Sequence, residues 1–535
     1  MKPSRRSEIG APKLALLAIV ITLWSPPSAT ANITGVEITS SQSYGTFAAG
    51  EYVRLDGKLT GEVSPNEPIP DLDKATKNAS GVVEYSTAFT LIYPKAPSSG
   101  NGALLIDVPN RGLPISHALY NSPRERPLML GSLDAGTGFL ENRGFSIAIV
   151  QWELGEGITP PTYVDEQRQK RFIEGVGVIA VRDFAYFLRY EGATPSGQKN
   201  PLAGAINRSF AVGYSQTARF LKTLLINGFN VTKSKPAFDG IHLHAGHAGV
   251  LPLLRSGVGP RSVAGGLATF TTPDFRGVHE EPFTYHDTVK AIESKGQKAP
   301  YLIVTHTDND YPSLRASLTR TGANGTVDVP IPQNVRMYDV AGAAHLNVRD
   351  VGKTCDLTAG QLDWSPIMRS SLVNLDRWVK DSALPPNNRL MALESRTKET
   401  IILQAPSYLP NATILVPKRD HDGNSVGGVR LPDMEAPLGV YGGQNAPLRS
   451  VVCMLASSYV PFAKTKAERE ASRDNRPSLE ERYAVGLNEY LNKIRFSANR
   501  LVDEKFLLEE DAAVIVNSAA ESLVFKPTPV PPIFR

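Results

Sequence analysis

Two different patterns of apolar and polar residues divide the chain. Between residues 32 and 94, apolar side chains recur at about every second position, in short runs separated by glycine, proline and serine. Such alternation is typical of antiparallel strands that bury one face. The runs at residues 35–39, 52–59 and 88–93 therefore predict a β-rich N-terminal extension of a larger sheet.

From residue 103 onwards the predicted strands are nearly continuous apolar runs, and they alternate with helical segments such as residues 176–188. This pattern indicates a parallel sheet that helices cover on both faces. In such sheets, ligands bind beyond the carboxyl ends of the strands. The predicted strands occupy residues 103–108, 145–150, 210–213, 240–243, 301–304 and 335–338.

The end of the chain changes character twice. Residues 397–437 are irregular and rich in proline and glycine. After Pro477, residues 478–481 have the sequence of a helix capping box, and residues 501–515 form a further amphipathic run. We predict a C-terminal helical segment that packs back on the core.

The N-terminus has the features of a secretory signal peptide. Basic residues precede a largely apolar run at residues 14–24, two prolines follow it, and small residues occupy positions 29–31. The run is too short to span a bilayer comfortably, which favours a signal peptide over a membrane anchor. We expect cleavage after Ala31 and a secreted or periplasmic protein that has no membrane association after cleavage.

These boundaries give four predicted regions. They are a signal peptide at residues 1–31, the β extension at 32–95, an α/β core at 96–396 and the C-terminal segment at 397–535.

Composition narrows the class of protein. The chain has 535 residues, of which 41% are hydrophobic and 21% charged, with a formal net charge of +4. These values are typical of a globular protein with a large core, and no dense run of lysine and arginine predicts a nucleic-acid partner. The two cysteines, Cys355 and Cys453, predict one disulfide in an oxidising compartment, with two buried thiols as the alternative.

The segment with the clearest chemistry is residues 213–217, Gly-Tyr-Ser-Gln-Thr, between the strand at 210–213 and an apolar helix. A serine on such a strand-to-helix turn exposes its hydroxyl at the top of a sheet, as a nucleophile does. Thr217 stands where a second glycine is usual. The alternative interpretation is an ordinary helix N-terminus capped by Ser215.

An acid and a histidine follow two later strands. Asp308 and Asp310 come after the strand at 301–304, and His345 follows the strand at 335–338. The order serine, acid, histidine along successive strands is that of a hydrolytic triad. We predict Ser215 as nucleophile, His345 as base and either aspartate as the acid that orients it.

The same architecture predicts two backbone donors for an oxyanion. One is the N–H of Gln216, and the other comes from the loop at residues 110–112, at Arg111.

Two further groups have competing interpretations. His242, His244 and His247 lie close in sequence, but their spacing is irregular and no acidic residue accompanies them. We interpret them as a pocket wall or core histidines rather than a zinc site, and we expect neither a metal nor an organic cofactor. Phe283, Tyr285 and His286 are candidates for a lid or pocket, with ordinary packing of an insertion as the alternative.

With these residues assembled, the chain resembles the bacterial and fungal family of alpha/beta hydrolase domain proteins. The family favours glycine at the position of Ala218, where this chain differs. Its pattern has a carboxylate directly before the aromatic residue at Tyr311, which favours Asp310 over Asp308. The resemblance extends over residues 110–112, 138–144, 213–219, 311–318, 334–345, 375–386, 429–433, 461–463 and 476–483.

The resemblance implies an α/β-hydrolase fold with a mostly parallel central sheet. We therefore predict a carboxylic ester hydrolase that forms an acyl-enzyme on Ser215 and acts on a small-molecule ester. A peptidase or amidase would use the same triad, and a non-catalytic binding protein on a hydrolase scaffold is a further alternative.

Overall fold

The computed structural model describes residues 32–251, 282–395, 414–447, 450–522 and 525. The predicted signal peptide and part of the irregular region, residues 396–413, lie outside these ranges. Across the described ranges, no helix combines the length and the apolar character that a membrane span needs.

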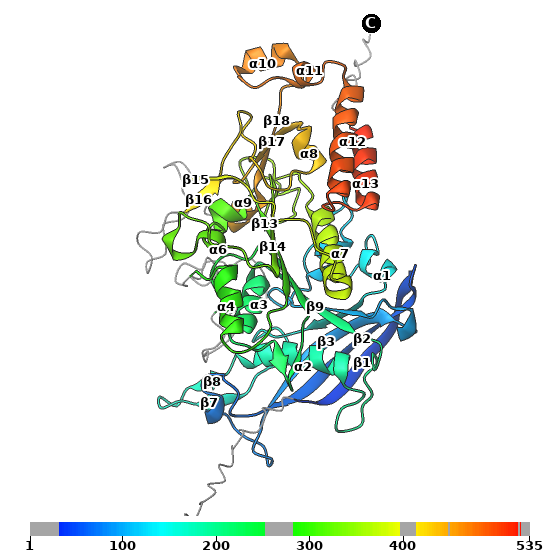
Figure 1. Cartoon of the computed structure of the whole chain (residues 1–535), viewed down its shortest axis with the longest axis vertical. Coiled ribbons are helices and arrows are strands. Elements are labelled where there is room, and N and C mark those ends of the chain that lie inside the picture. Colours follow the sequence, from blue (N-terminus) through cyan, green and yellow to red (C-terminus); the bar gives the residue numbers. More distant parts are fainter. Residues whose placement is uncertain (1–31, 252–281, 396–413, 448–449, 523–524, 526–535) are drawn as a thin grey trace, which may run out of the picture.

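A ten-stranded sheet runs through the molecule (Figure 1). Its N-terminal strands pair antiparallel, from β1 to β3 and from β3 to β5, and every pairing from β5 to β14 is parallel. Short β6 (Ile158–Thr159) pairs with β3 off this path. The order across the sheet is β1 (Asn32–Phe47), β2 (Gly50–Val63), β3 (Val83–Pro94), β5 (Ser146–Val150), β4 (Ala103–Asp107), β9 (Arg208–Tyr214), β12 (Gly240–His244), β13 (Tyr301–Thr307) and β14 (Val335–Val340).

The N-terminal strands confirm the predicted β extension. Along β3, residues alternate between buried and partly exposed positions, as the apolar alternation requires. Glycines in β2 make room for aromatic rings on β3, because a Cβ on Gly61 would lie 2.3 Å from the Tyr85 ring. The extension is therefore part of the main sheet.

The parallel strands are buried along their length, as their continuous apolar runs predict. Every residue of β4, β5, β9 and β12 is buried. One apolar cluster packs α2 (Val176–Tyr190), α3 (Gln216–Ile226) and α4 (Tyr285–Glu293) on one face of the sheet. A second cluster packs α7 (Ser365–Asp381) on the other face, and Figure 1 shows these two layers on opposite sides of β9.

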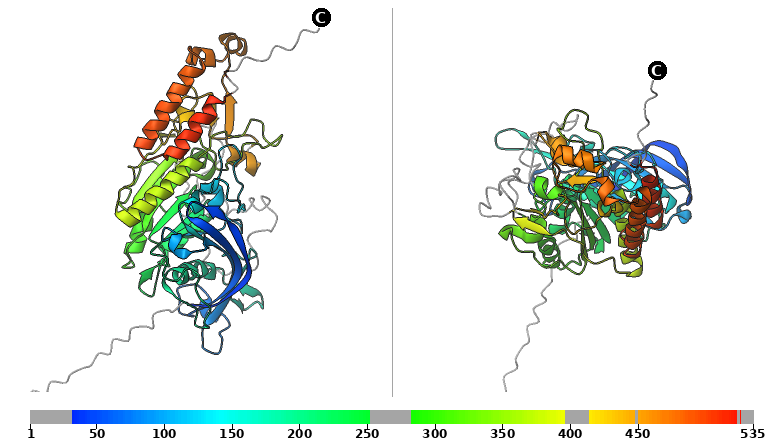
Figure 2. Two further views of the ribbon diagram at one scale, coloured as in Figure 1. Left: turned by 90° about the vertical axis from the view of Figure 1, so that its right-hand side faces the viewer. Right: turned by 90° about the horizontal axis from the view of Figure 1, so that it is seen from above.

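The C-terminal segment packs on the core, as predicted. It ends in two long helices, α12 (Leu487–Asp503) and α13 (Glu509–Ala520), and Figure 2 shows them beside α7. Asn374 and Ser370 of α7 donate hydrogen bonds to the carbonyls of Lys505 and Phe506 in the turn between these helices. The segment is therefore continuous with the helical layer of α7.

One boundary in this segment differs from the sequence-based expectation. Residues 501–515 do not form one amphipathic run, because α12 ends at Asp503 and Lys505 has a positive φ of 64°. The apolar spacing continues across the turn because Leu501, Phe506 and Leu507 all face the same cluster. The predicted capping box is present at α11 (Leu479–Arg482), where Ser478 and Glu481 cap the helix reciprocally.

The remaining elements are short. The helices are α1 (Phe139–Asn142), α5 (Asp310–Leu314), α6 (Leu318–Thr321), α8 (Pro432–Glu435), α9 (Val451–Ala456) and α10 (Lys466–Ser472), with a π-helical turn at His117–Asn121 and 3₁₀ turns at Leu72–Lys74, Pro97–Ser99 and Gly322–Asn324. Small two-stranded sheets pair β7 (Thr162–Val164) with β8 (Lys170–Phe172), β10 (Val231–Thr232) with β11 (Lys235–Pro236), β15 (Leu393–Ser395) with β16 (Leu415–Pro417), and β17 (Gly439–Gly442) with β18 (Ser458–Pro461).

The architecture confirms the predicted α/β-hydrolase fold: a mostly parallel central sheet, antiparallel N-terminal strands and C-terminal helices. It also brings the carboxyl ends of β4, β9, β12, β13 and β14 to one edge of the sheet.

A buried ion pair joins α2 to the loop between β2 and β3. The Arg182 guanidinium contacts the carboxylates of Glu67 and Asp183, and the hydroxyl of Tyr85 donates to Asp183 at 3.3 Å. Arg182 and Asp183 are only 3% and 2% exposed. Burial raises the pKa of the Asp183 carboxyl even though Arg182 lies beside it.

We expect Arg182→Met to lower the free energy of unfolding by about 3–5 kcal/mol at pH 7, because it leaves two buried carboxylates without a cation. The deficit should shrink toward pH 4, since the Asp183 carboxyl can then fold in its neutral form. Urea unfolding at both pH values measures it. Lys95→Met, which removes a cation from an exposed ion pair with Glu51, is the control and should cause no measurable change. Equal stability of the two variants would contradict this account.

Candidate active site

The turn at Ser215 joins strand β9 directly to helix α3. Strand β9 ends at Tyr214 and α3 begins at Gln216, so Ser215 alone makes the turn, with φ 56° and ψ −109°. A non-glycine residue in this region costs about 1–3 kcal/mol, so its surroundings must hold it there. The Ser215 N–H donates to the carbonyl of His244 at 2.9 Å, at the end of β12.

Small residues allow helix α3 to pack this close to the strands. A Cβ on Gly213 would lie 2.5 Å from the carbonyl oxygen of Thr217, so no larger residue fits there. A Cβ on Gly246 would lie 2.7 Å from the Cβ of Ala218. Gly246 therefore leaves room for the Ala218 methyl group.

Thr217 explains how the turn closes without its usual second glycine. Its hydroxyl oxygen accepts from the N–H of Tyr214 at 2.9 Å and donates to the carbonyl of Tyr214 at 3.2 Å. The Thr217 side chain thus folds back on the end of β9 and forms hydrogen bonds with both the N–H and the carbonyl of Tyr214.

The three predicted residues Ser215, His345 and Asp310 lie in hydrogen-bonding contact. Ser215 Oγ lies 3.1 Å from His345 Nε2, and His345 Nδ1 lies 2.6 Å from Asp310 Oδ1. A carboxylate can only accept, so the His345 proton lies on Nδ1 and Nε2 accepts from the serine hydroxyl. Ser215 is 8% exposed, and the other two are more deeply buried.

The Asp310 carboxylate is stabilised in its ionised form. Burial alone would raise the pKa of Asp310, but His345, His306 and the N–H of Thr307 together hold it below its ordinary value. The Thr307 N–H donates to Asp310 Oδ2 at 2.7 Å, which leaves Oδ1 facing the imidazole.

Asp308, the alternative acid, has a different partner. Its carboxylate accepts both arms of the Arg419 guanidinium, at 2.6 and 2.8 Å, and the N–H of Gly342 at 3.1 Å. Asp308 therefore joins the loop after β13 to the loop that carries His345 and to the C-terminal segment. The sequence contains no signal for the Arg419 contact, because 111 residues separate the two.

The two residues predicted to supply the oxyanion donors, Gln216 and Arg111, are in direct hydrogen-bonding contact. Gln216 is the first residue of α3, so its backbone N–H has no acceptor within the helix. The Arg111 N–H donates to the side-chain oxygen of Gln216 at 3.1 Å. Asn110 joins the loop of Arg111 to the end of β9, since its amide donates to the carbonyl of Tyr214 at 2.8 Å.

Two histidines of β12, His242 and His244, belong to a buried hydrogen-bonded group. His242 contacts the Tyr120 hydroxyl at 2.7 Å, and both His242 and His244 contact the Thr305 hydroxyl. Burial lowers the pKa of His242 to about 3 and lowers that of His244 well below its ordinary value, so both are neutral. Among the residues that the structure describes, no group of three or more His, Cys, Asp or Glu side chains is arranged to hold a metal ion.

Tyr214 is a site residue that the sequence reasoning did not identify. Its ring stacks with His345, at 5.1 Å between centroids, and with His244, at 5.2 Å. Its hydroxyl donates to the His345 carbonyl at 2.5 Å. The only available signal was its place beside Ser215 in the motif.

The disulfide between Cys355 and Cys453 confirms the predicted pairing. Cys453 lies in α9, whose last residues contact both loops that carry the acid and the histidine. The Met454 carbonyl accepts from the Asn309 and Ser313 side chains at 2.9 Å, and the Leu455 carbonyl accepts from the Leu346 N–H at 3.0 Å.

The three candidates for a lid or pocket, Phe283, Tyr285 and His286, differ in how deeply they are buried. Tyr285 is 2% exposed and packs in the core as the first residue of α4, with the Lys222 ammonium 4.9 Å from its ring centre. Phe283 and His286 are half-buried. Tyr285 therefore serves as packing.

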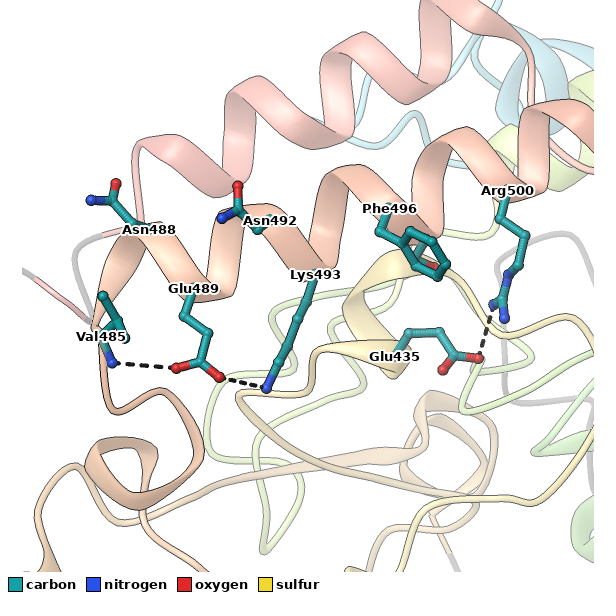
Figure 3. A pocket seen from close by; sticks show the side chains of 9 residues that line it. Glu435, Val485, Asn488, Glu489, Asn492, Lys493, Phe496 and Arg500 are labelled. Atoms are coloured by element: carbon teal, nitrogen blue, oxygen red, sulfur yellow. Dashed lines mark hydrogen bonds and ion pairs between the residues drawn. The ribbon is translucent and has the colours of Figure 1, made fainter.

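A separate cavity of about 600 Å³ lies along α12 (Figure 3). Exposed Phe496 lines it, and its charged side chains pair with one another, Glu489 with Lys493 and Glu435 with Arg500. None of the predicted site residues lines this cavity.

Comparison with known proteins identifies one family. A family model described as alpha/beta hydrolase domain matches residues 164–517. The matched range contains Ser215, Asp310 and His345 and does not reach Arg111. No curated protein matches the chain significantly.

Several solved structures are similar over about half of the chain. TT1662 from Thermus thermophilus is 14% identical, with 55% of this chain and 94% of that chain covered and a TM-score of 0.27. The rice cell wall degrading esterase LipA from Xanthomonas oryzae is 11% identical, with 58% and 90% covered and a TM-score of 0.28. The fluorophosphonate-binding serine hydrolase FphF from Staphylococcus aureus is 8% identical, with 58% and 90% covered and a TM-score of 0.23.

The disulfide closes a sequence separation of 98 residues. We expect the double variant Cys355→Ser, Cys453→Ser to lose about 2–5 kcal/mol of unfolding free energy, because its unfolded chain is less constrained. Urea unfolding with and without a reducing agent measures this. The reductant should destabilise the wild-type protein and leave the variant unchanged. If reduced and oxidised wild type were equally stable, the disulfide would not have the proposed effect.

Proposed function

Since the chain belongs to the alpha/beta hydrolase domain family, we propose that it is a serine hydrolase that cleaves carboxylic esters through an acyl-enzyme on Ser215. The observation that carries the proposal is the hydrogen-bonded series from Ser215 Oγ to His345 Nε2, at 3.1 Å, and from His345 Nδ1 to Asp310 Oδ1, at 2.6 Å. A serine hydroxyl is a weak nucleophile near neutral pH and needs such a base.

In the proposed reaction, His345 Nε2 takes the proton from Ser215 Oγ as this oxygen attacks the ester carbonyl carbon. The carbonyl oxygen becomes an oxyanion, and the protonated His345 then gives its proton to the leaving alcohol as the ester bond breaks. His345 then takes a proton from water as the water oxygen attacks the acyl carbon, and the bond from this carbon to Ser215 Oγ breaks. The carboxylic acid leaves, and His345 returns the proton to Ser215 Oγ. The steps use only the chain's own groups, the ester and water.

Two features support this assignment of roles. The carboxylate of Asp310 stays ionised because its pKa lies below the ordinary value, and it faces Nδ1, where it stabilises the positive charge that forms on His345. The N–H of Gln216, at the start of α3, and the N–H of Arg111 are the proposed oxyanion donors.

We also propose that the protein is exported. The apolar run at residues 14–24 and the small residues before Asn32 support a cleaved signal peptide. The disulfide supports an oxidising compartment. Sequencing of the mature N-terminus from periplasm or medium should begin at Asn32, and an uncleaved cytosolic protein would contradict export.

A fluorophosphonate probe should label the wild-type protein at Ser215, and peptide mass spectrometry identifies the site. We expect Ser215→Ala to lose both labelling and the hydrolysis of p-nitrophenyl esters, since no other atom takes the nucleophile's place. A parallel panel of peptide amides tests for the alternative activity, that of a peptidase or amidase. Absence of labelling, with a control hydrolase labelled, would contradict an enzymatic function, and cleavage of amides alone would contradict an esterase.

The two aspartates provide a matched pair for the same assay. Asp310→Asn should lower kcat by about 10⁴-fold, because an amide at this position favours the wrong His345 tautomer. Asp308→Asn should retain most of kcat and lower stability, because it weakens the contact with Arg419. The reverse order of kcat losses would make Asp308 the acid.

A further inference from the structure

The Gln216 side chain connects two groups next to the nucleophile. Its Oε1 accepts from the Arg111 N–H at 3.1 Å, and its Nε2 donates to Glu153 Oε1 at 2.9 Å. Only this orientation of the amide satisfies both neighbours, because the backbone N–H can only donate and the carboxylate accepts. The proposed oxyanion donor, the Arg111 N–H, is therefore already hydrogen-bonded to an amide oxygen, Gln216 Oε1.

Hydrogen bonds on both sides of Arg111 hold the loop that carries this donor. The Trp152 indole N–H donates to the Pro109 carbonyl at 2.8 Å, and the Gln151 amide donates to the Gly112 carbonyl at 3.0 Å. The amide of Asn110 holds the loop to the Tyr214 carbonyl at 2.8 Å. The direction of the Arg111 N–H is thus fixed, and the Gln216 side chain, with its rotatable bonds, is the partner that can leave.

Such a contact has a physical reason. A backbone N–H without an acceptor in a partly buried site costs free energy, and the Gln216 amide satisfies it while no substrate is bound. An oxyanion forms a charge-assisted hydrogen bond, about twice as strong as the neutral one to an amide oxygen. The developing oxyanion is therefore better able to displace the amide than a ground-state carbonyl is.

We infer that Gln216 Oε1 is an internal ligand of the oxyanion donor Arg111 N–H, and that the substrate's carbonyl oxygen must displace it. This inference rests on the proposed function. It makes Gln216 a residue with two opposite effects: its backbone N–H assists the reaction, and its side chain competes with the substrate for the second donor.

Gln216→Met tests the inference, because it keeps the length of the side chain and the backbone N–H but removes the amide. We expect kcat/KM for a short p-nitrophenyl ester to rise about 2- to 10-fold, the worth of one neutral hydrogen bond. The inhibition constant of phenylboronic acid, which forms a tetrahedral adduct on a serine, should fall by a similar factor. Thermal unfolding verifies that the variant is folded.

Gln151→Met is the matched control. It removes an amide that holds the same loop at the Gly112 carbonyl, without a contact to the Arg111 N–H, and should give no increase in either quantity. A fall in kcat/KM for folded Gln216→Met would overturn the inference and make Gln216 a positioning residue, and an unchanged value would overturn it as well. Both results are distinct from failure of the proposed function, which would appear as a wild-type protein that the fluorophosphonate probe does not label.

Discussion

One backbone hydrogen bond, from the Ser215 N–H to the His244 carbonyl, joins the end of β9 to the end of β12. It is possible because the two strands are parallel neighbours, with Tyr214 opposite His244 in the register. The bond holds Ser215 at a positive φ that the residue would not adopt freely. The position of the serine hydroxyl therefore depends on the register of the sheet, and Gly213 and Gly246 provide the space in which that register brings α3 close.

The other two residues of the series depend on the C-terminal segment. Arg419 binds Asp308, which in turn accepts the Gly342 N–H of the loop before His345. Helix α9 contacts that loop at Leu346 and the acid loop at Asn309. The disulfide fixes α9 to the chain that follows His345. A segment that is irregular in sequence thus completes the support of a site whose residues lie on the sheet.

This division explains what could be predicted from the sequence. Ser215, Asp310 and His345 each follow a strand whose apolar run is clear, and parallel strands bring their carboxyl ends together. The contact of Tyr214 with His345, the Arg419 ion pair and the contact of the Gln216 amide with Arg111 have no comparable pattern, because each joins residues more than a hundred positions apart. The turn at Lys505 was missed for the opposite reason: the apolar spacing continues across it while the backbone does not.

The buried histidines show why polarity alone is a poor guide to a metal or catalytic role. Burial keeps His242 and His244 neutral, so their rings act as flat, hydrogen-bonding surfaces rather than charges. His244 supports Tyr214, and Tyr214 supports the catalytic imidazole of the proposed mechanism. A charged His244 would place a second positive charge near His345 at the moment when that ring becomes an imidazolium. Because His244 is neutral, the ring stack orients His345 without opposing that charge, and the nearby carboxylate of Asp310 stabilises it.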